Sequence, residues 1–124
     1  MNIVSAGKES ETLACQYLQK KGLILLEQNY HSYHGEIDLI MQDKQDIVFV
    51  EVRSRSSIAY GNALESINQN KMKKLITTAL QYLQKKKWLY VKNSRFDIVT
   101  IDLASKIKHP KWIRNAFNIE GSNF

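Results

Sequence analysis

Two neighbouring segments of this chain, residues 35–40 and 47–53, alternate apolar and polar side chains and carry acidic residues at fixed points. Alternation with period 2 is typical of half-buried strands, and the polar residues 43–46 between them favour a turn, so we expect an antiparallel hairpin. The register that keeps the apolar residues together places Leu39 opposite Val50 and, further along, Ile37 opposite Val52. A slip by one residue would move acidic residues onto the apolar face.

The same register determines where the acidic side chains meet. It places Asp38 opposite Glu51 and Glu36 opposite Arg53, with facing β-carbons about 4.5 to 5.5 Å apart. Two carboxylates side by side repel each other unless they share a proton, lie beside a cation or hold a divalent metal. Mg²⁺ and Mn²⁺ prefer oxygen ligands. The spacing alone therefore leaves two hypotheses open: a metal site, or an ion-paired sheet surface neutralised by Arg53, Arg55 and solvent.

Length and charge limit the class of protein. The 124 residues suffice for one domain, 1–124, and no apolar run approaches the ~20 residues of a membrane span, so we expect a cytoplasmic protein with no membrane partner. The single Cys15 is expected to be a packed side chain. A net charge of +6 and a pI near 9.4 favour a polyanionic partner such as nucleic acid.

Periodicity predicts the remaining elements, which together indicate an α/β fold. Helices are expected over residues 8–21 and 64–86, with an edge strand over 23–30 and further strands over 88–91 and 95–101. Residues 56–62 are expected to form a loop that either contacts substrate or is disordered, and residues 104–117 a C-terminal extension. No dinucleotide fingerprint, phosphate-binding glycine loop or Ser/His/Asp arrangement is present in the sequence, so we expect no organic cofactor.

Five features together resemble the YraN-like family of small bacterial proteins over about residues 7–117: Glu11, residues 35–40, residues 49–53, Lys71 and residues 95–97. That family is similar to the restriction-endonuclease-like superfamily, which includes Holliday junction resolvases and whose motif is an Asp followed by Glu-X-Lys. The resemblance implies a three-layer fold, with a central mixed β-sheet flanked by α-helices. It also implies a site for Mg²⁺ or Mn²⁺, DNA or another nucleic acid as partner, and a homodimer.

The resemblance assigns metal ligands by position. Asp38 and Glu51 would hold the metal, with the Val52 carbonyl as a backbone ligand and Glu11 as an additional acidic group.

The resemblance also shows one departure from the nuclease motif. Arg53 stands where the motif has lysine, and an arginine keeps its proton in proteins, so Arg53 cannot act as the base that activates water. Its guanidinium could still clamp a phosphate. Lys71 would supply the missing ammonium or, on the alternative reading, be a solvated helix residue. Glu36 is expected to orient Arg53.

These expectations favour a divalent-metal-dependent endonuclease acting on DNA, with branched or structured DNA as the candidate substrate. The alternative is a non-catalytic nucleic-acid-binding protein that retains the nuclease fold. A third hypothesis is an interaction protein whose acidic pair and lysine clusters bind another protein.

Overall fold

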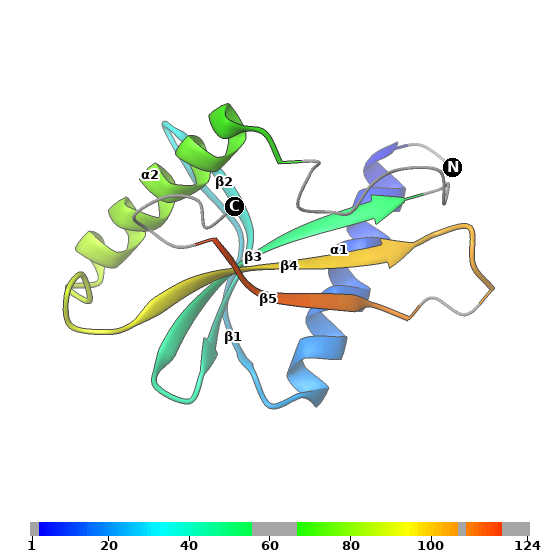
Figure 1. Ribbon diagram of the computed structural model, residues 1–124, viewed down its shortest axis with the longest axis horizontal. Helices are drawn as coiled ribbons and strands as arrows, with labels where there is room; N and C mark the ends of the chain where they lie inside the picture. Colours follow the sequence, from blue (N-terminus) through cyan, green and yellow to red (C-terminus); the bar gives the residue numbers. More distant parts are fainter. Residues whose placement is uncertain (1–2, 56–66, 107–108, 118–124) are drawn as a thin grey trace.

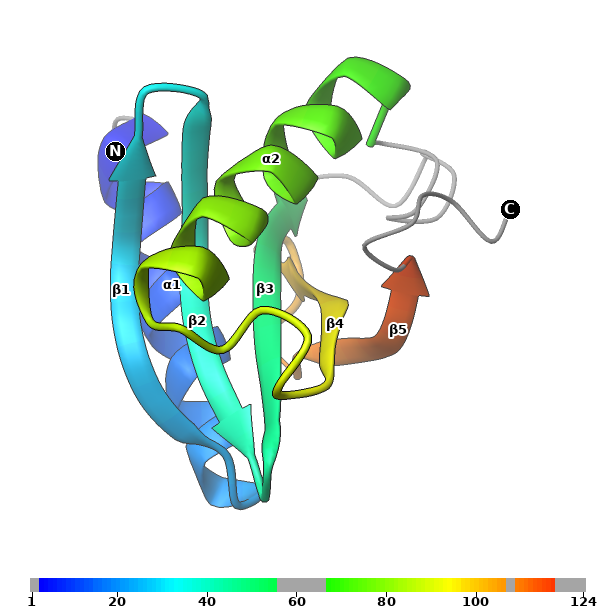
Figure 2. The ribbon, with the colours of Figure 1, turned by 90° about the vertical axis from the view of Figure 1, so that its left-hand side faces the viewer.

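A mixed five-stranded sheet forms the centre of the molecule, with one helix against each face (Figure 1, Figure 2). The computed structural model describes residues 3–55, 67–106 and 109–117. Its elements in chain order are α1 (Ile3–Lys20), β1 (Ile24–Ser32), β2 (Gly35–Asp43), β3 (Asp46–Arg55), α2 (Gln69–Lys85), β4 (Ser94–Asp102) and β5 (Lys111–Phe117). Neither of the two helices in the described part of the chain is both long and apolar enough to cross a membrane.

The strands follow one another across the sheet in the order β1-β2-β3-β4-β5. Strands β3 and β4 are parallel, and the other neighbours are antiparallel. A parallel pair needs a crossover connection, and α2 lies within it, between β3 and β4. The predicted α/β class, a mixed sheet flanked by helices, is confirmed.

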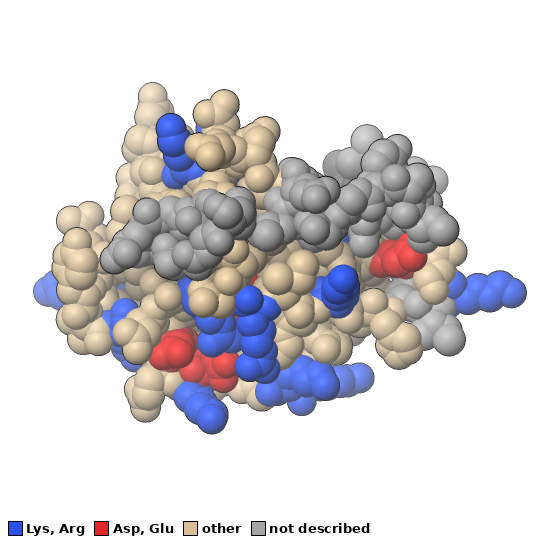
Figure 3. Space-filling model, viewed as in Figure 1, with Lys and Arg blue, Asp and Glu red and all other residues tan. Residues whose placement is uncertain are grey.

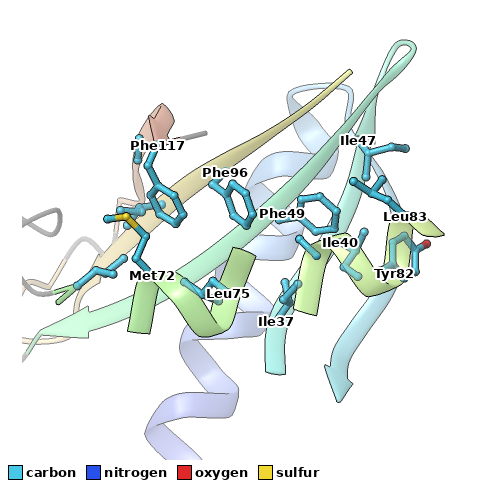
Figure 4. Packing of buried hydrophobic residues seen from close by; sticks show 14 residues of the cluster. Ile37, Ile40, Ile47, Phe49, Met72, Leu75, Tyr82, Leu83, Phe96 and Phe117 are labelled. Carbon is cyan, nitrogen blue, oxygen red and sulfur yellow. The ribbon is translucent and has the colours of Figure 1, made fainter. Parts of the chain in front are cut away.

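A hydrophobic core fills each space between the sheet and a helix. On the α2 side, aromatic rings of the central strands pack against the apolar stripe of the helix (Figure 4). The rings of Phe49 and Phe96 lie 5.2 Å apart, and those of Phe96 and Phe117 stack at 4.6 Å. On the α1 side, Leu18 packs in a second cluster with valines of β3 and β4. Cys15 is buried there as predicted, and burial raises the pKa of its thiol. The two cores fix the sheet on both faces.

Helix α2 begins later than the sequence pattern predicts. Residues 64–66, like the predicted loop over 56–62, lie outside the described residues. Asn68 is extended, and its side chain accepts the backbone N–H of Lys71 at 2.8 Å, so it caps the helix and α2 starts at Gln69.

The predicted strand over 88–91 is wrong. The backbone N–H of Trp88 donates to the Leu83 carbonyl at 2.8 Å, and Tyr90 has a left-handed φ of 64°, so the chain turns instead of extending. The Trp88 ring packs 6.0 Å from that of Tyr82. Trp88 and Leu89 therefore pack against the core without joining the sheet, while Tyr90 and Val91 are exposed.

The C-terminal extension contains a strand that the sequence pattern does not reveal. Strand β5 pairs with β4, with a register shift between Phe96 and Ile98. Asn115 within it has a left-handed φ of 51°. These two irregularities break the period-2 alternation by which a strand is recognised.

Candidate active site

The β2–β3 hairpin adopts the predicted register. Leu39 pairs with Val50, and the ladder continues in step to the turn, where Asp43 pairs with Asp46. Regular pairing extends from the turn as far as Leu39 and Val50, so the two predicted acidic positions lie just beyond its end.

Asp38 accounts for the end of the ladder. Its Oδ2 accepts the backbone N–H of Val52 at 2.8 Å, so a side chain bonds the strand in place of a backbone carbonyl. Ile37 consequently packs in the α2-side core while Leu39 packs in the α1-side core. The prediction that Ile37 and Leu39 share one apolar face is wrong, because Asp38 interrupts the alternation between them.

Glu51 is the buried acid of the site, with 6% of its surface exposed. Its Oε2 lies 3.4 Å from the Nζ of Lys71 and 3.3 Å from an Nη of Arg53. Burial, followed by repulsion from Asp38, raises the pKa of Glu51 from its ordinary 4.5 to about 7, although the two cations oppose the rise. Near neutral pH this carboxyl is therefore poised between its protonated and ionised forms.

Lys71 reaches the site from the first turn of α2, as the sequence prediction allowed. The Asn68 cap holds that turn, and the Lys71 side chain crosses from the helix to Glu51. Sequence reasoning missed Asn68. The signal was present, because an asparagine just before an apolar helical stripe is a typical N-cap.

Arg53 contacts the same carboxylate but is incompletely bonded. Its side chain is 31% exposed, and its Nε is buried without a hydrogen-bond partner in the described part of the chain. A buried donor without a partner is costly, so its presence suggests that an acceptor belongs at this guanidinium.

Glu11 lies on α1 and interacts with the site electrostatically. Burial, then repulsion from Asp38, raises the pKa of Glu11, while a hydrogen bond with Asn29 lowers it. Within residues 3–55, 67–106 and 109–117, no three His, Cys, Asp or Glu side chains converge as a metal-ligand set. The structure thus brings Asp38 and Glu51 together, and Glu11 as a ligand stays a prediction.

Glu36 does not contact Arg53. Its carboxylate lies 3.1 Å from the Nδ1 of His31 on β1, whereas Arg53 contacts Glu51. The expectation that Glu36 orients Arg53 is wrong, because the β2–β3 ladder ends before these positions and Glu36 faces the edge strand.

The third acidic motif, residues 95–97, forms a different kind of centre. Asp97 is completely buried, and its carboxylate accepts hydrogen bonds from the Arg95 guanidinium, the Trp112 indole at 2.9 Å and the Asn115 backbone at 2.9 Å. Arg95 also reaches Asp43 at 3.0 Å. This network ties β5 and the β2–β3 turn to β4, so its role is structural.

The sequence pattern of "Uncharacterised protein family UPF0102" matches residues 10–101. The chain belongs to this family. A UPF0102 protein of Nitrosococcus oceani is 44% identical over 114 residues, which cover 92% of each chain. UPF0102 proteins of Pseudomonas aeruginosa (strain PAO1) and Legionella pneumophila are 43% and 44% identical, and each alignment covers 90% of this chain and over 90% of the relative. The resemblance to small bacterial proteins without an assigned activity is confirmed at the level of the family.

Exposed lysines lie beside the site of this UPF0102 protein. Lys73 and Lys74 are exposed on α2 just beyond Lys71, and blue basic side chains are spread over the molecular face shown in Figure 3, with red acidic ones confined to a few places. The site therefore combines two close carboxylates and two cations in contact with one of them, with further exposed lysines on the same helix. Such a combination can hold a hard cation and accept a phosphate.

Proposed function

We propose that this UPF0102 protein is a divalent-metal-dependent endonuclease that hydrolyses phosphodiester bonds in DNA. The observation that carries the proposal is the position of Glu51: a buried carboxyl that repels Asp38 and at the same time contacts Lys71 and Arg53. Perturbed titratable groups that combine burial with specific charge partners are typical of catalytic sites.

The donor set fits Mg²⁺ or Mn²⁺. Asp38 and Glu51 would hold the ion, with the Val52 carbonyl and Glu11 as the further oxygen groups that the family resemblance implies. Burial and, after it, repulsion from Asp38 raise the pKa of Glu51, and a cation between the two carboxylates would relieve the repulsion. When bound, it would supply Lewis-acid stabilisation of the charge that develops on the phosphoryl group.

The chain's own cations would act on the phosphate. Lys71 Nζ, within 3.4 Å of Glu51, would orient the attacking water or neutralise a phosphoryl oxygen. Arg53, whose Nη lies at Glu51 and whose side chain is 31% exposed, would donate to non-bridging oxygens. Water would form the new P–O bond as the ester P–O bond breaks. The attacking water would lose one proton to the surrounding solvent, and the leaving oxygen would take one up.

The layered α/β architecture supports assignment to the restriction-endonuclease-like superfamily. So does the order of Asp38, Glu51 and a basic residue two positions later. Branched or structured DNA enters as a substrate only through the likeness to resolvases. A nucleic-acid-binding protein without turnover is the second candidate, and the observation that favours it is Arg53 at the motif-lysine position.

The test is a cleavage assay on supercoiled plasmid and synthetic four-way junctions with Mn²⁺ or with EDTA. We expect Mn²⁺-dependent nicking or cutting by the wild-type protein and at least a hundredfold loss in Asp38→Asn and in Glu51→Gln, variants that keep side-chain shape. Arg53→Lys restores the motif lysine and should raise the rate.

Cleavage that persists in both acidic variants would indicate a contaminating nuclease and overturn the proposal. DNA binding that weakens steeply with salt, with no cleavage under any condition, would support the non-catalytic candidate instead. Absence of both would leave the protein-interaction hypothesis.

A further inference from the structure

The turn between β1 and β2 presents an aromatic side chain that the proposed active site does not use. Tyr33 is 97% exposed, and its ring lies 5.1 Å from that of His34 in an edge-to-face arrangement. These two residues form the tip of the hairpin, between Ser32 and Gly35, which pair with each other. A tyrosine ring so fully in water contributes almost no buried area to the core and leaves its planar surface open to a ligand.

The hairpin tip is anchored against α2. The Ser32 hydroxyl donates to Thr78 Oγ1 at 3.4 Å and accepts the backbone N–H of His34 at 3.1 Å. A Cβ at Gly35 would lie 3.3 Å from Thr78 Oγ1 and 3.5 Å from the Cβ of Lys74, so glycine permits this close approach. The turn reaches the upper end of the sheet beside α2 in Figure 2. Tyr33 is thus exposed on a turn that contacts with α2 hold in place.

Two elements lead from this tip to the acidic pair. Asp38 lies three residues beyond Gly35 on β2, about 10 Å along an extended strand. Lys74 borders the same surface hollow as Tyr33, and it lies one helical turn, roughly 4.5 Å of rise, beyond Lys71, whose ammonium contacts Glu51. The aromatic tip, the lysines and the carboxylates therefore follow one another across the surface.

We propose that Tyr33 is a stacking platform for an unpaired base of the DNA whose backbone occupies the Asp38–Glu51 site. The inference rests on the proposed function and narrows its substrate class to DNA with single-stranded segments. Aromatic side chains beside basic groups that follow the backbone are the usual means of binding single-stranded nucleic acid. Here Lys74 and Lys71 supply the positive charge, and the tyrosine supplies the planar face.

The experiment measures binding by fluorescence anisotropy in EDTA, so that its result does not depend on turnover. The probes are a blunt duplex and the same duplex with a few unpaired thymidines at one end. We expect the wild-type protein to prefer the overhang, Tyr33→Ala to lose about tenfold in overhang affinity, and Tyr33→Phe to keep it. The affinity of Tyr33→Ala for the blunt duplex should stay within twofold of wild type.

Tyr90→Ala is the matched control. Tyr90 is 96% exposed in the turn after α2, at the end of that helix far from its Asn68 cap, and it should be replaceable without effect on either probe. The inference is overturned by equal overhang affinities of wild type and Tyr33→Ala, or by a wild-type protein that does not prefer the overhang. If the protein does not cleave DNA but still prefers the overhang through Tyr33, the proposed endonuclease activity is contradicted and the stacking role of Tyr33 is supported.

Discussion

Two carboxylates lie buried in the neighbouring parallel strands of this protein, and their surroundings differ. The side chain of Asp97 on β4 has no exposed surface. Its carboxylate accepts hydrogen bonds from the Arg95 guanidinium, the Trp112 indole and the Asn115 backbone. Glu51 on β3 contacts two cations but also faces Asp38, and its pKa is raised to about 7.

The difference separates a carboxylate whose partners hold the fold together from one whose surroundings disfavour its charge. The hydrogen bonds and the ion pair of Asp97 tie three parts of the chain together. Glu51 is held where ionisation is unfavourable, an arrangement that lowers stability and is typical of functional sites. The comparison predicts opposite signs for the effect of neutralising the two residues.

The largest expected effect is a loss of stability on neutralising Asp97. Asp97→Asn removes the negative charge that compensates Arg95, whose side chain is 17% exposed, and should lower the free energy of unfolding by about 3 to 5 kcal/mol. Urea denaturation measures it. Asp46→Asn is the control, because its carboxylate is 43% exposed and 4.0 Å from Arg95, and its loss should stay below about 1 kcal/mol. If Asp97→Asn and Asp46→Asn lower the free energy of unfolding equally, Asp97 has no special structural role.

Neutralising Glu51 should instead stabilise the protein above neutral pH. A raised folded-state pKa means that the folded protein binds more protons than the unfolded chain between about pH 4.5 and 7, so wild-type stability falls as pH rises through that window. Glu51→Gln has no carboxyl to ionise, so at pH 8 its free energy of unfolding should exceed that of wild type by on the order of 2 to 3 kcal/mol. At pH 4 its stability should match that of wild type. Thermal unfolding from pH 4 to 8 measures the difference, and a variant that is less stable at pH 8 would contradict the account.

A smaller effect is expected at the cap that positions Lys71. Asn68→Ala removes the acceptor for the Lys71 backbone N–H and should cost about 1 kcal/mol of stability, whereas Asn68→Ser should lose less. Because Lys71 opposes the rise of the Glu51 pKa, loosening the first turn should also move that pKa further up. NMR titration of the Glu51 side chain in both proteins would measure this change in its pKa. A Glu51 titration unchanged in Asn68→Ala would show that the lysine is positioned independently of its cap.

The sequence predicts the hairpin register well because a strand with a buried face tolerates no slip. Leu39 and Val50 pair as alternation requires. It does not predict the interruption at Asp38, since that depends on a side chain bonding a backbone N–H of the other strand. The sequence places Asp38 beside Glu51 by assuming that regular β2–β3 pairing continues to these residues. In the structure that pairing stops at Leu39 and Val50.

The errors elsewhere have similar causes. The apolar run over 88–91 resembles a short strand, but the backbone N–H groups of Trp88 and Leu89 donate to the Leu83 carbonyl of α2, and that of Val91 donates to Trp88. Strand β5 escapes detection because Asn115 and the register shift in its pairing disturb the alternation. Lys71 was a candidate from the sequence, but only the cap at Asn68 and the packing of α2 on the sheet bring its ammonium to Glu51.

The most direct test of the central claim, that Asp38 and Glu51 form a cation site, is calorimetric titration of Mn²⁺ into wild-type protein and Glu51→Gln between pH 6 and 8. Because the ion competes with the proton on Glu51, we predict that wild type binds Mn²⁺ with proton release and more tightly at pH 8 than at pH 6. Binding should be at least tenfold weaker in Glu51→Gln. An affinity that is the same in both proteins and does not change with pH would contradict the account.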